Sequence, residues 1–153
     1  MALISWVYLV ILVVALGTTI GLRFMVKLYA AVNWWRRGFY LLIAVLSGVI
    51  GWLTGPHDAN GWMSNLFIIG MFIVFAFWPK GLSHQAVIAG LGSTRPLSAV
   101  TQVTLEAVGP AQSRMLTQVG TIVVSRLMFN QTTSELQQTL QPFFKSEQIH
   151  LKK

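Results

Sequence analysis

The chain has 153 residues, of which 54% are hydrophobic and only 10% are charged, and its mean hydropathy is +0.63. Because an ordinary soluble domain is about one quarter charged, this composition argues against a wholly soluble protein. The chain has no cysteine, which excludes disulfides, thiolate nucleophiles and zinc thiolate sites, and the cations behind its net charge of +7 are too scattered to predict nucleic-acid binding.

Three long apolar stretches carry no Asp, Glu, Lys or Arg, and they cover residues 2–22, 38–57 and 59–79. A helix of about 20 residues crosses the hydrocarbon core of a bilayer. We therefore expect three membrane spans within residues 1–79, at about 2–22, 38–56 and 60–79. No basic residue precedes the first stretch, and Arg23 and Lys27 follow it. The first stretch is thus expected to be a retained span and not a signal peptide.

The segment 23–37 between the first two spans is basic and partly apolar. Two interpretations are equally good. The segment is a helix lying in the membrane interface, or the first span simply continues for a turn or two while its cations reach toward water. The candidates for setting topology or meeting lipid headgroups are Arg23, Lys27, Arg36, Arg37 and Lys80.

Small residues recur at four-residue spacing in two of the expected spans, a pattern that lets helix backbones approach closely. The helix-packing candidates are Ser47, Gly48, Gly51 and Gly55 in the second span and Gly17 and Gly21 in the first. Packing among the protein's own helices is favoured over packing against a partner. No span contains an ionisable residue and no inverted repeat is visible, which disfavours a self-sufficient transporter or proton channel.

Loop charges predict the orientation, since Lys and Arg collect on the cytoplasmic side. The segment 23–37 has four basic residues and no acid, whereas the turn 55–60 has only Asp58. The part that follows the third span carries seven basic residues against three acids. We expect a multi-pass protein of a bacterial inner membrane, with its N-terminus outside and its C-terminal part in the cytoplasm.

Residues 80–144 are expected to form a small α+β cytoplasmic domain. Short apolar or alternating runs at 86–89, 99–108, 114–118 and 121–129 predict strands, with a hairpin around Gly120. Thr132 and Glu135 have the spacing of a capping box, so a helix should follow and end near Pro142. Strands closed by one amphipathic helix suit a pleckstrin-homology-like half barrel, and the tail 145–153 is expected to fray.

The layout resembles the YobD-type family of small bacterial inner-membrane proteins. The resemblance rests on three spans, the motif Arg36-Arg37-Gly38 at the start of the second, the pair Pro79-Lys80 after the third, and a small β domain with a terminal helix. It covers nearly the whole chain and implies no catalytic residues. It implies, as a hint about partners, an association with sugar phosphotransferase permeases. The β domain of this chain has fewer charged and aromatic residues than the family pattern.

No motif predicts a catalytic, cofactor-binding or metal site. The three histidines are isolated, and Gly90-Leu91-Gly92 with Arg95 lacks the ending of a phosphate loop, so a turn is expected there. We therefore expect a non-enzymatic protein held in the lipid bilayer. Its β domain would act as an interaction module for a cytoplasmic protein, a lipid headgroup or a companion membrane protein. Alternatively, the chain is an accessory subunit of a larger permease.

Overall fold

The structure is a computed structural model, and it describes residues 3–90 and 92–152. The chain divides into two compact units. The first holds the residues up to Arg23 together with Asn33–Trp78, and the second holds Phe24–Val32 together with the residues from Pro79 onward. The short segment between the first two spans therefore folds with the C-terminal half of the chain.

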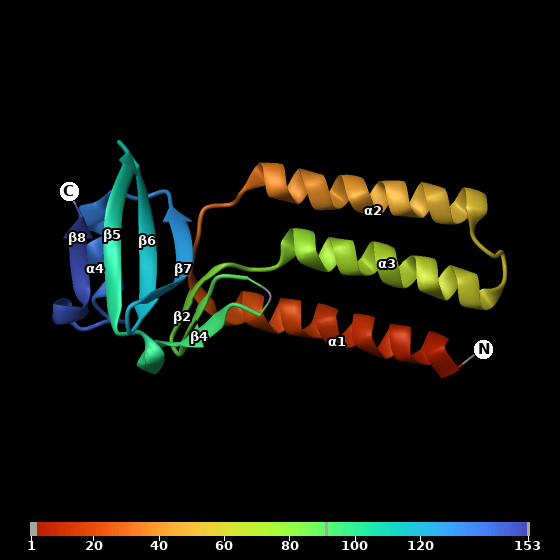
Figure 1. The fold of residues 1–153 in the computed structure, drawn as a ribbon, viewed down its shortest axis with the longest axis horizontal. Helices are drawn as coiled ribbons and strands as arrows, with labels where there is room; N and C mark the ends of the chain where they lie inside the picture. The colour runs from red at the N-terminus through yellow and green to blue at the C-terminus, as the bar shows by residue number, and fades with distance from the viewer. Residues whose placement is uncertain (1–2, 91, 153) are drawn as a thin grey trace. The chain divides into compact units, whose positions relative to one another are not determined.

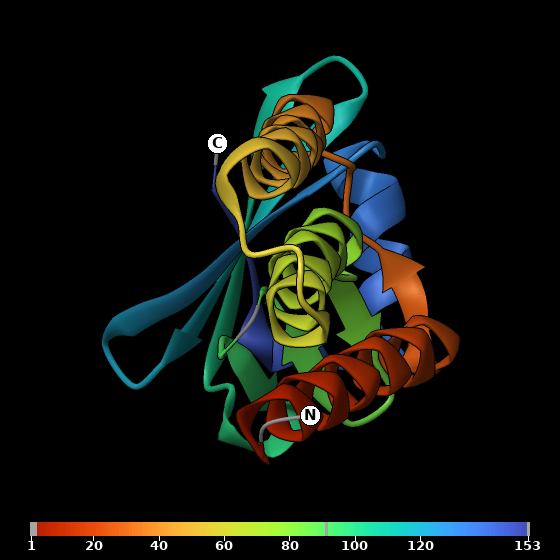
Figure 2. The same cartoon turned by 90° about the vertical axis from the view of Figure 1, so that its right-hand side faces the viewer.

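The first unit consists of three helices, each long and apolar enough to cross a membrane: α1 (Leu3–Met25), α2 (Trp34–Thr54) and α3 (Ala59–Phe77). This confirms the expectation of a membrane protein with three candidate spans. Figures 1 and 2 show α3 between α1 and α2. Both later helices begin at a capping side chain: the Asn33 amide oxygen accepts from the Arg36 N–H at 3.1 Å, and the Asp58 carboxylate accepts from the Gly61 N–H at 2.9 Å.

Helices α1 and α3 meet along a row of matched residues. The Ser5 hydroxyl donates to the Asn60 side-chain oxygen at 2.9 Å. One turn further on, the rings of Tyr8 and Phe67 stack with centroids 4.9 Å apart. At the next level, Gly70 leaves the room that Leu12 occupies, since a Cβ at Gly70 would lie 2.6 Å from a Leu12 methyl carbon.

The segment after α1 is a strand and not an interfacial helix. Helix α1 continues to Met25, about one turn beyond the expected end, and β1 (Val26–Tyr29) follows at once. The strand alternates: Val26 is buried and Lys27 is exposed. The expected interfacial helix is therefore wrong, and the simple continuation of the span accounts only for the first three residues of the segment.

Strand β1 lies at the edge of an antiparallel sheet with the order β1-β2-β3-β4. The other strands are β2 (Gly81–Ser83), β3 (Ala86–Ile88) and β4 (Thr94–Pro96). Leu28 pairs with Leu82 and Tyr29 with Gly81. A Cβ at Gly81 would collide with the Leu28 carbonyl oxygen and lie 2.9 Å from a Val26 methyl carbon, so the pairing needs a glycine there.

The second sheet has the order β7-β6-β5-β8. Its strands are β5 (Gln102–Gly109), β6 (Gln112–Val119), β7 (Ile122–Phe129) and β8 (Ile149–Lys152). The expected hairpin around Gly120 is present, and this residue has the positive φ of 62° that favours glycine in a tight turn. The expectation of a fraying tail is wrong, because β8 pairs in parallel with β5 from Val103 opposite Ile149 to Glu106 opposite Lys152.

Helix α4 (Thr133–Leu140) begins with the expected capping box. The Glu135 N–H donates to the Thr132 hydroxyl, and the Thr132 N–H donates to the Glu135 carboxylate at 3.0 Å. The hydrogen bond from the Thr132 backbone N–H, followed by one from the Thr132 side chain, lowers the pKa of the exposed Glu135 carboxyl. The helix ends two residues before Pro142, as the sequence predicts.

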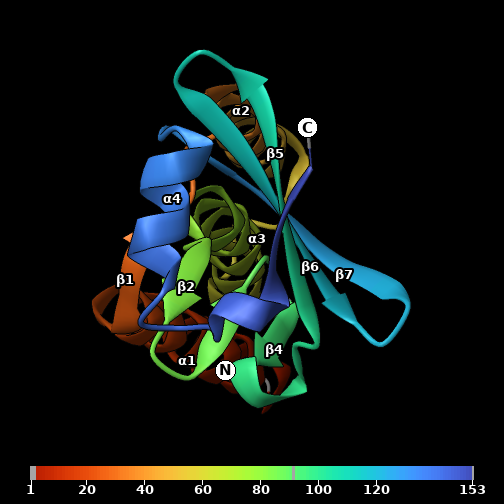
Figure 3. The same cartoon turned by 90° about the vertical axis from the view of Figure 1, so that its left-hand side faces the viewer.

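One hydrophobic core joins both sheets and α4 in the second unit. Leu136 and Leu140 are fully buried against it, together with Phe144. Residues of both sheets complete the core: Ala30, Leu82, Val87, Val100, Val103, Leu105, Met115, Leu127, Phe129 and Ile149. In Figure 3 the β6–β7 hairpin extends away from α4. The described part of the chain forms two sheets and no closed barrel, and this arrangement does not confirm the pleckstrin-homology-like half barrel.

Candidate functional site

The second sheet has one face in the core and one face that carries charge. Successive side chains of a strand point to opposite faces, and the pattern is clean in β5 and β6: Val103, Leu105 and Met115 are buried, and their neighbours are not. We call the opposite side the outer face. Its residues are Thr104, Glu106, Arg114, Leu116, Arg126, Met128, His150 and Lys152.

The outer face is built from two cross-strand rows. In one row Glu106 stands opposite Arg114 on one side and Lys152 on the other, and both cations lie 3.5 Å from its carboxylate. The side chains of Arg114 and Lys152 are 41% and 62% exposed, so each pair contributes at most about 1 kcal/mol to stability. These pairs organise the surface more than they stabilise the fold.

The second row mixes polar, apolar and basic groups. Thr104 stands opposite Leu116 and His150, and Leu116 stands opposite Arg126. Arg126 and His150 are exposed, while Leu116 is half-buried. Three cations and one acid, with apolar Leu116 and Met128 between them, form a surface that can hold both a carboxylate and an apolar side chain of a partner.

Sequence analysis missed this face because its members are spread over four strands. Arg114 and Arg126 lie in different strands, and Lys152 was assigned to a fraying tail. The alternation within β6 could have identified one strand's contribution. The parallel pairing of β8 with β5 completes the face. It joins segments that are far apart in the chain, so no local sequence pattern predicts it.

The small-residue candidates of the second span differ in what surrounds them. Positions 48 and 51 face α3: a Cβ at Gly48 would lie 3.3 Å from an Ile69 methyl carbon, and one at Gly51 would overlap the Asn65 amide. Gly55 ends α2, with its N–H donating to the Gly51 carbonyl at 3.0 Å. Ser47 is half-buried beside Gly51 in a cavity described below.

The small residues of the first span face open space. A Cβ at Gly17 or Gly21 would meet no atom within 4 Å, and both positions are exposed. They therefore do not pack against α2 or α3 as the structure describes these helices, and the expected packing among the protein's own spans does not extend to them.

The basic candidates occupy several different environments. Arg36 and Arg37 lie in the first turn of α2 and not in a loop. The Arg36 guanidinium donates to the Phe75 carbonyl at 3.4 Å, near the end of α3, where the free carbonyls of a helix attract a cation. The Arg37 guanidinium lies over the rings of Trp34 and Phe77, 5.8 and 5.5 Å from their centroids.

The other three basic candidates lie near the points where the chain passes between the two units. Arg23 is in the last turn of α1 and Lys27 is exposed on β1. The backbone carbonyl of Lys80 accepts a hydrogen bond from the Ala30 N–H at 3.0 Å, next to the β1–β2 pairing.

Among residues 3–90 and 92–152, no three His, Asp or Glu side chains cluster so that they could hold a metal ion. His84 stacks on the Phe143 ring with centroids 5.8 Å apart. The glycine segment forms a turn in which the Ala89 N–H donates to the Ser93 carbonyl, and Arg95 follows it in exposed β4; Leu91 lies outside the described residues.

The chain matches no known protein family model, and no curated protein or solved structure shows significant similarity to it. The site must therefore be interpreted from its own geometry.

The contact between α2 and α3 makes a first prediction. Gly51→Leu places a branched side chain where the Asn65 amide lies, and overpacking of this kind costs about 1–3 kcal/mol. We expect a lower midpoint for thermal loss of helicity in mild detergent. Val45→Leu is the matched control, because Val45 is exposed on the same helix. Equal midpoints for the two variants would show that α2 and α3 do not pack at Gly51.

Proposed function

We propose that this protein is a non-enzymatic, membrane-anchored interaction module, and that the outer face of its second sheet binds a cytoplasmic protein. The observation that carries the proposal is the contribution of β1 to the soluble unit. The chain enters or leaves this unit at three points: after Met25, between Tyr29 and Trp34, and between Phe77 and Gly81. The connecting segments have at most four residues, which span no more than about 14 Å.

Three short connections restrict the domain far more than a single tether would. A domain on one long linker samples a large volume, whereas short connections at three points leave it little freedom. This restriction supports the proposal of a membrane-anchored module. The three-span layout also supports the proposed kinship with the YobD-type family.

The chemistry of the outer face favours a protein partner over a lipid surface. Glu106 lies between Arg114 and Lys152 and offsets part of their charge. An anionic membrane attracts clustered, uncompensated cations. Protein interfaces are instead enriched in Arg and Met, which agrees with Arg114, Arg126 and Met128 on this face.

Photo-crosslinking in the native cells tests this proposal. A photoreactive amino acid at position 126 should give a discrete adduct with one protein, and Leu116→Glu in the same chain should abolish the adduct. The matched control carries the photoreactive residue in place of Arg95, an exposed cation on the other sheet. An adduct of equal yield at position 95, or none at position 126, would contradict the proposal.

The orientation is a second part of the proposal, with the domain in the cytoplasm of a bacterium and the N-terminus outside. A folded unit cannot be divided by a bilayer. Residues 26–29 and 81–152 therefore share one side, and the turn between α2 and α3 lies on the other. The basic character of segment 23–37 supports the cytoplasm for the shared side.

The absence of cysteine allows a direct test of orientation. His57→Cys should react with a membrane-impermeant maleimide in cells whose outer membrane is permeabilised and whose inner membrane is intact. Thr121→Cys, exposed at the β6–β7 turn, should react only after lysis. The opposite labelling pattern would show that the topology is inverted, and it would contradict a cytoplasmic partner.

The alternative function, an accessory subunit of a permease, is favoured by one observation. Gly17 and Gly21 are exposed on α1 at a spacing that suits close helix approach. Under this alternative a multi-span protein should co-purify stoichiometrically in mild detergent and be lost on Gly21→Leu. A photo-crosslinked soluble partner without such a subunit would favour the interaction module.

A further inference from the structure

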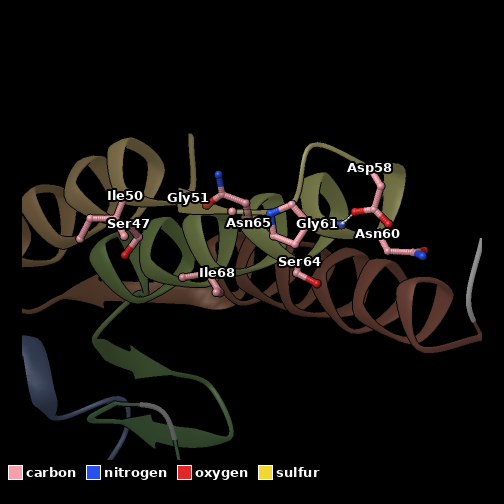
Figure 4. Close-up of a pocket in the computed structure, with 11 residues that line it drawn as sticks. Ser47, Ile50, Gly51, Asp58, Asn60, Gly61, Ser64, Asn65 and Ile68 are labelled. Atoms are coloured by element: carbon pink, nitrogen blue, oxygen red, sulfur yellow. Dashed lines mark hydrogen bonds between the residues drawn. The ribbon is translucent and has the colours of Figure 1, made fainter. Parts of the chain in front are cut away.

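A cavity of about 550 Å³ opens along α2 and α3 at the end where the two helices are joined. Figure 4 shows its lining side chains along both helices. The lining residues are Ser47, Ile50, Gly51, Gly55, Pro56, Asp58, Asn60, Gly61, Ser64, Asn65 and Ile68. From Ser47 to Gly55 the helix rises about 12 Å, so the cavity reaches well into the expected membrane-spanning part.

Three polar side chains in this cavity have no hydrogen-bond partner among the residues that the structure describes: Ser47, Ser64 and Asn65. The other Ser and Thr hydroxyls of the three helices behave differently. Thr18, Thr19 and Thr54 each donate to the carbonyl four residues earlier at 2.8 Å, and Ser5 bonds Asn60. Among the described Ser and Thr residues of these helices, the two without a partner, Ser47 and Ser64, thus both line the cavity.

All three side chains are half-buried, and a polar group that lies within a bilayer finds little water to bond. Two Ser and one Asn lining the same open cavity therefore indicate a polar occupant at this depth. The Gly51 backbone lies against the Asn65 amide, which limits the positions the amide can take. Ile50 and Ile68 line the same cavity and offer an apolar surface.

The end of the cavity nearest the turn carries a single charge. Asp58 is the only Asp, Glu, Lys or Arg between residues 38 and 79. One of its carboxylate oxygens accepts from the Gly61 N–H, which leaves the second oxygen for a ligand. The cavity has an acid at the turn, uncharged donors and acceptors further along the helices, and isoleucines beside them. These groups suit three parts of a phospholipid: the ammonium, the esters and the acyl chains, with the phosphate between the first two.

We infer that this cavity binds a phospholipid with a primary ammonium headgroup. The ammonium donates to Asp58, the ester oxygens accept from Ser64 and Asn65, and an acyl chain lies along Ile50 and Ile68. A quaternary ammonium has no N–H to donate, and Asp58 repels a headgroup whose phosphate charge is not offset by an ammonium. The site is thus selective for the primary amine, and the inference is independent of the partner proposed for the soluble domain.

Native mass spectrometry of the full chain in mild detergent tests the inference. The protein is titrated with phosphatidylethanolamine, phosphatidylcholine and phosphatidylglycerol of identical acyl chains. We expect phosphatidylethanolamine to bind roughly tenfold more tightly than the other two, as one hydrogen bond between charged groups implies. Equal affinity for the three lipids would overturn the inference. A dimer that binds none of the three lipids would also overturn it, since a helix of the second copy would then fill the cavity.

Two variants and a control locate the binding. Asp58→Asn keeps an acceptor for the helix cap and should reduce phosphatidylethanolamine binding to the level of phosphatidylcholine. Ser64→Ala should weaken binding of all three lipids. Thr54→Val is the control, because Thr54 lies at the same end of α2, does not line the cavity and already bonds the Ile50 carbonyl. An unchanged lipid preference in Asp58→Asn, with helicity retained, would also overturn the inference.

Discussion

The antiparallel pairing of β1 with β2 is the interaction on which the α+β unit depends. It joins a strand that follows α1 directly to one that lies just beyond α3. Two backbone hydrogen bonds extend the connection: the Ala30 N–H donates to the Lys80 carbonyl at 3.0 Å, and the Ala31 N–H donates to the Met128 carbonyl at 2.6 Å. Segment 24–32 thereby contacts the edges of both sheets. Val26 and Ala30 are buried, and burying one valine side chain contributes about 1.5–3 kcal/mol.

This pairing also relates the membrane helices to the domain's folding. Tyr29 and Gly81 are far apart in sequence, and closing a flexible loop of that length would cost conformational entropy. The intervening chain is mostly the α2–α3 hairpin, whose two helices return it to the side where it started. A preformed helical hairpin reduces the number of conformations that must be lost. We therefore expect the membrane helices to assist the folding of the α+β unit.

The features predicted from sequence are those that local chemistry determines. The three apolar helices follow from composition, the capping box follows from Thr132 and Glu135, and the β6–β7 hairpin follows from Gly120 between two apolar runs. Strands β1 and β8 were missed because each has only four residues and gains its stability from a distant partner. Apolar residues alternate with polar ones in both strands, at Val26 and Leu28 and at Ile149 and Leu151. A pattern of only two apolar positions is too short to predict a strand. The outer face and the cavity were missed for the same reason, since each depends on residues that only tertiary contacts bring together.

The most direct test of the account is whether β1 pairs with β2 in the membrane-embedded protein. Val26 and Ser83 are cross-strand partners, and Cα atoms of such partners lie within the range that a disulfide spans. In the chain without other cysteines, Val26→Cys with Ser83→Cys should form an intramolecular disulfide on mild oxidation of native membranes. Val26→Cys with Thr121→Cys, at the exposed β6–β7 turn, should not form one. Equal oxidation of the two pairs, or none in the first, would contradict an α+β unit assembled from both segments of the chain.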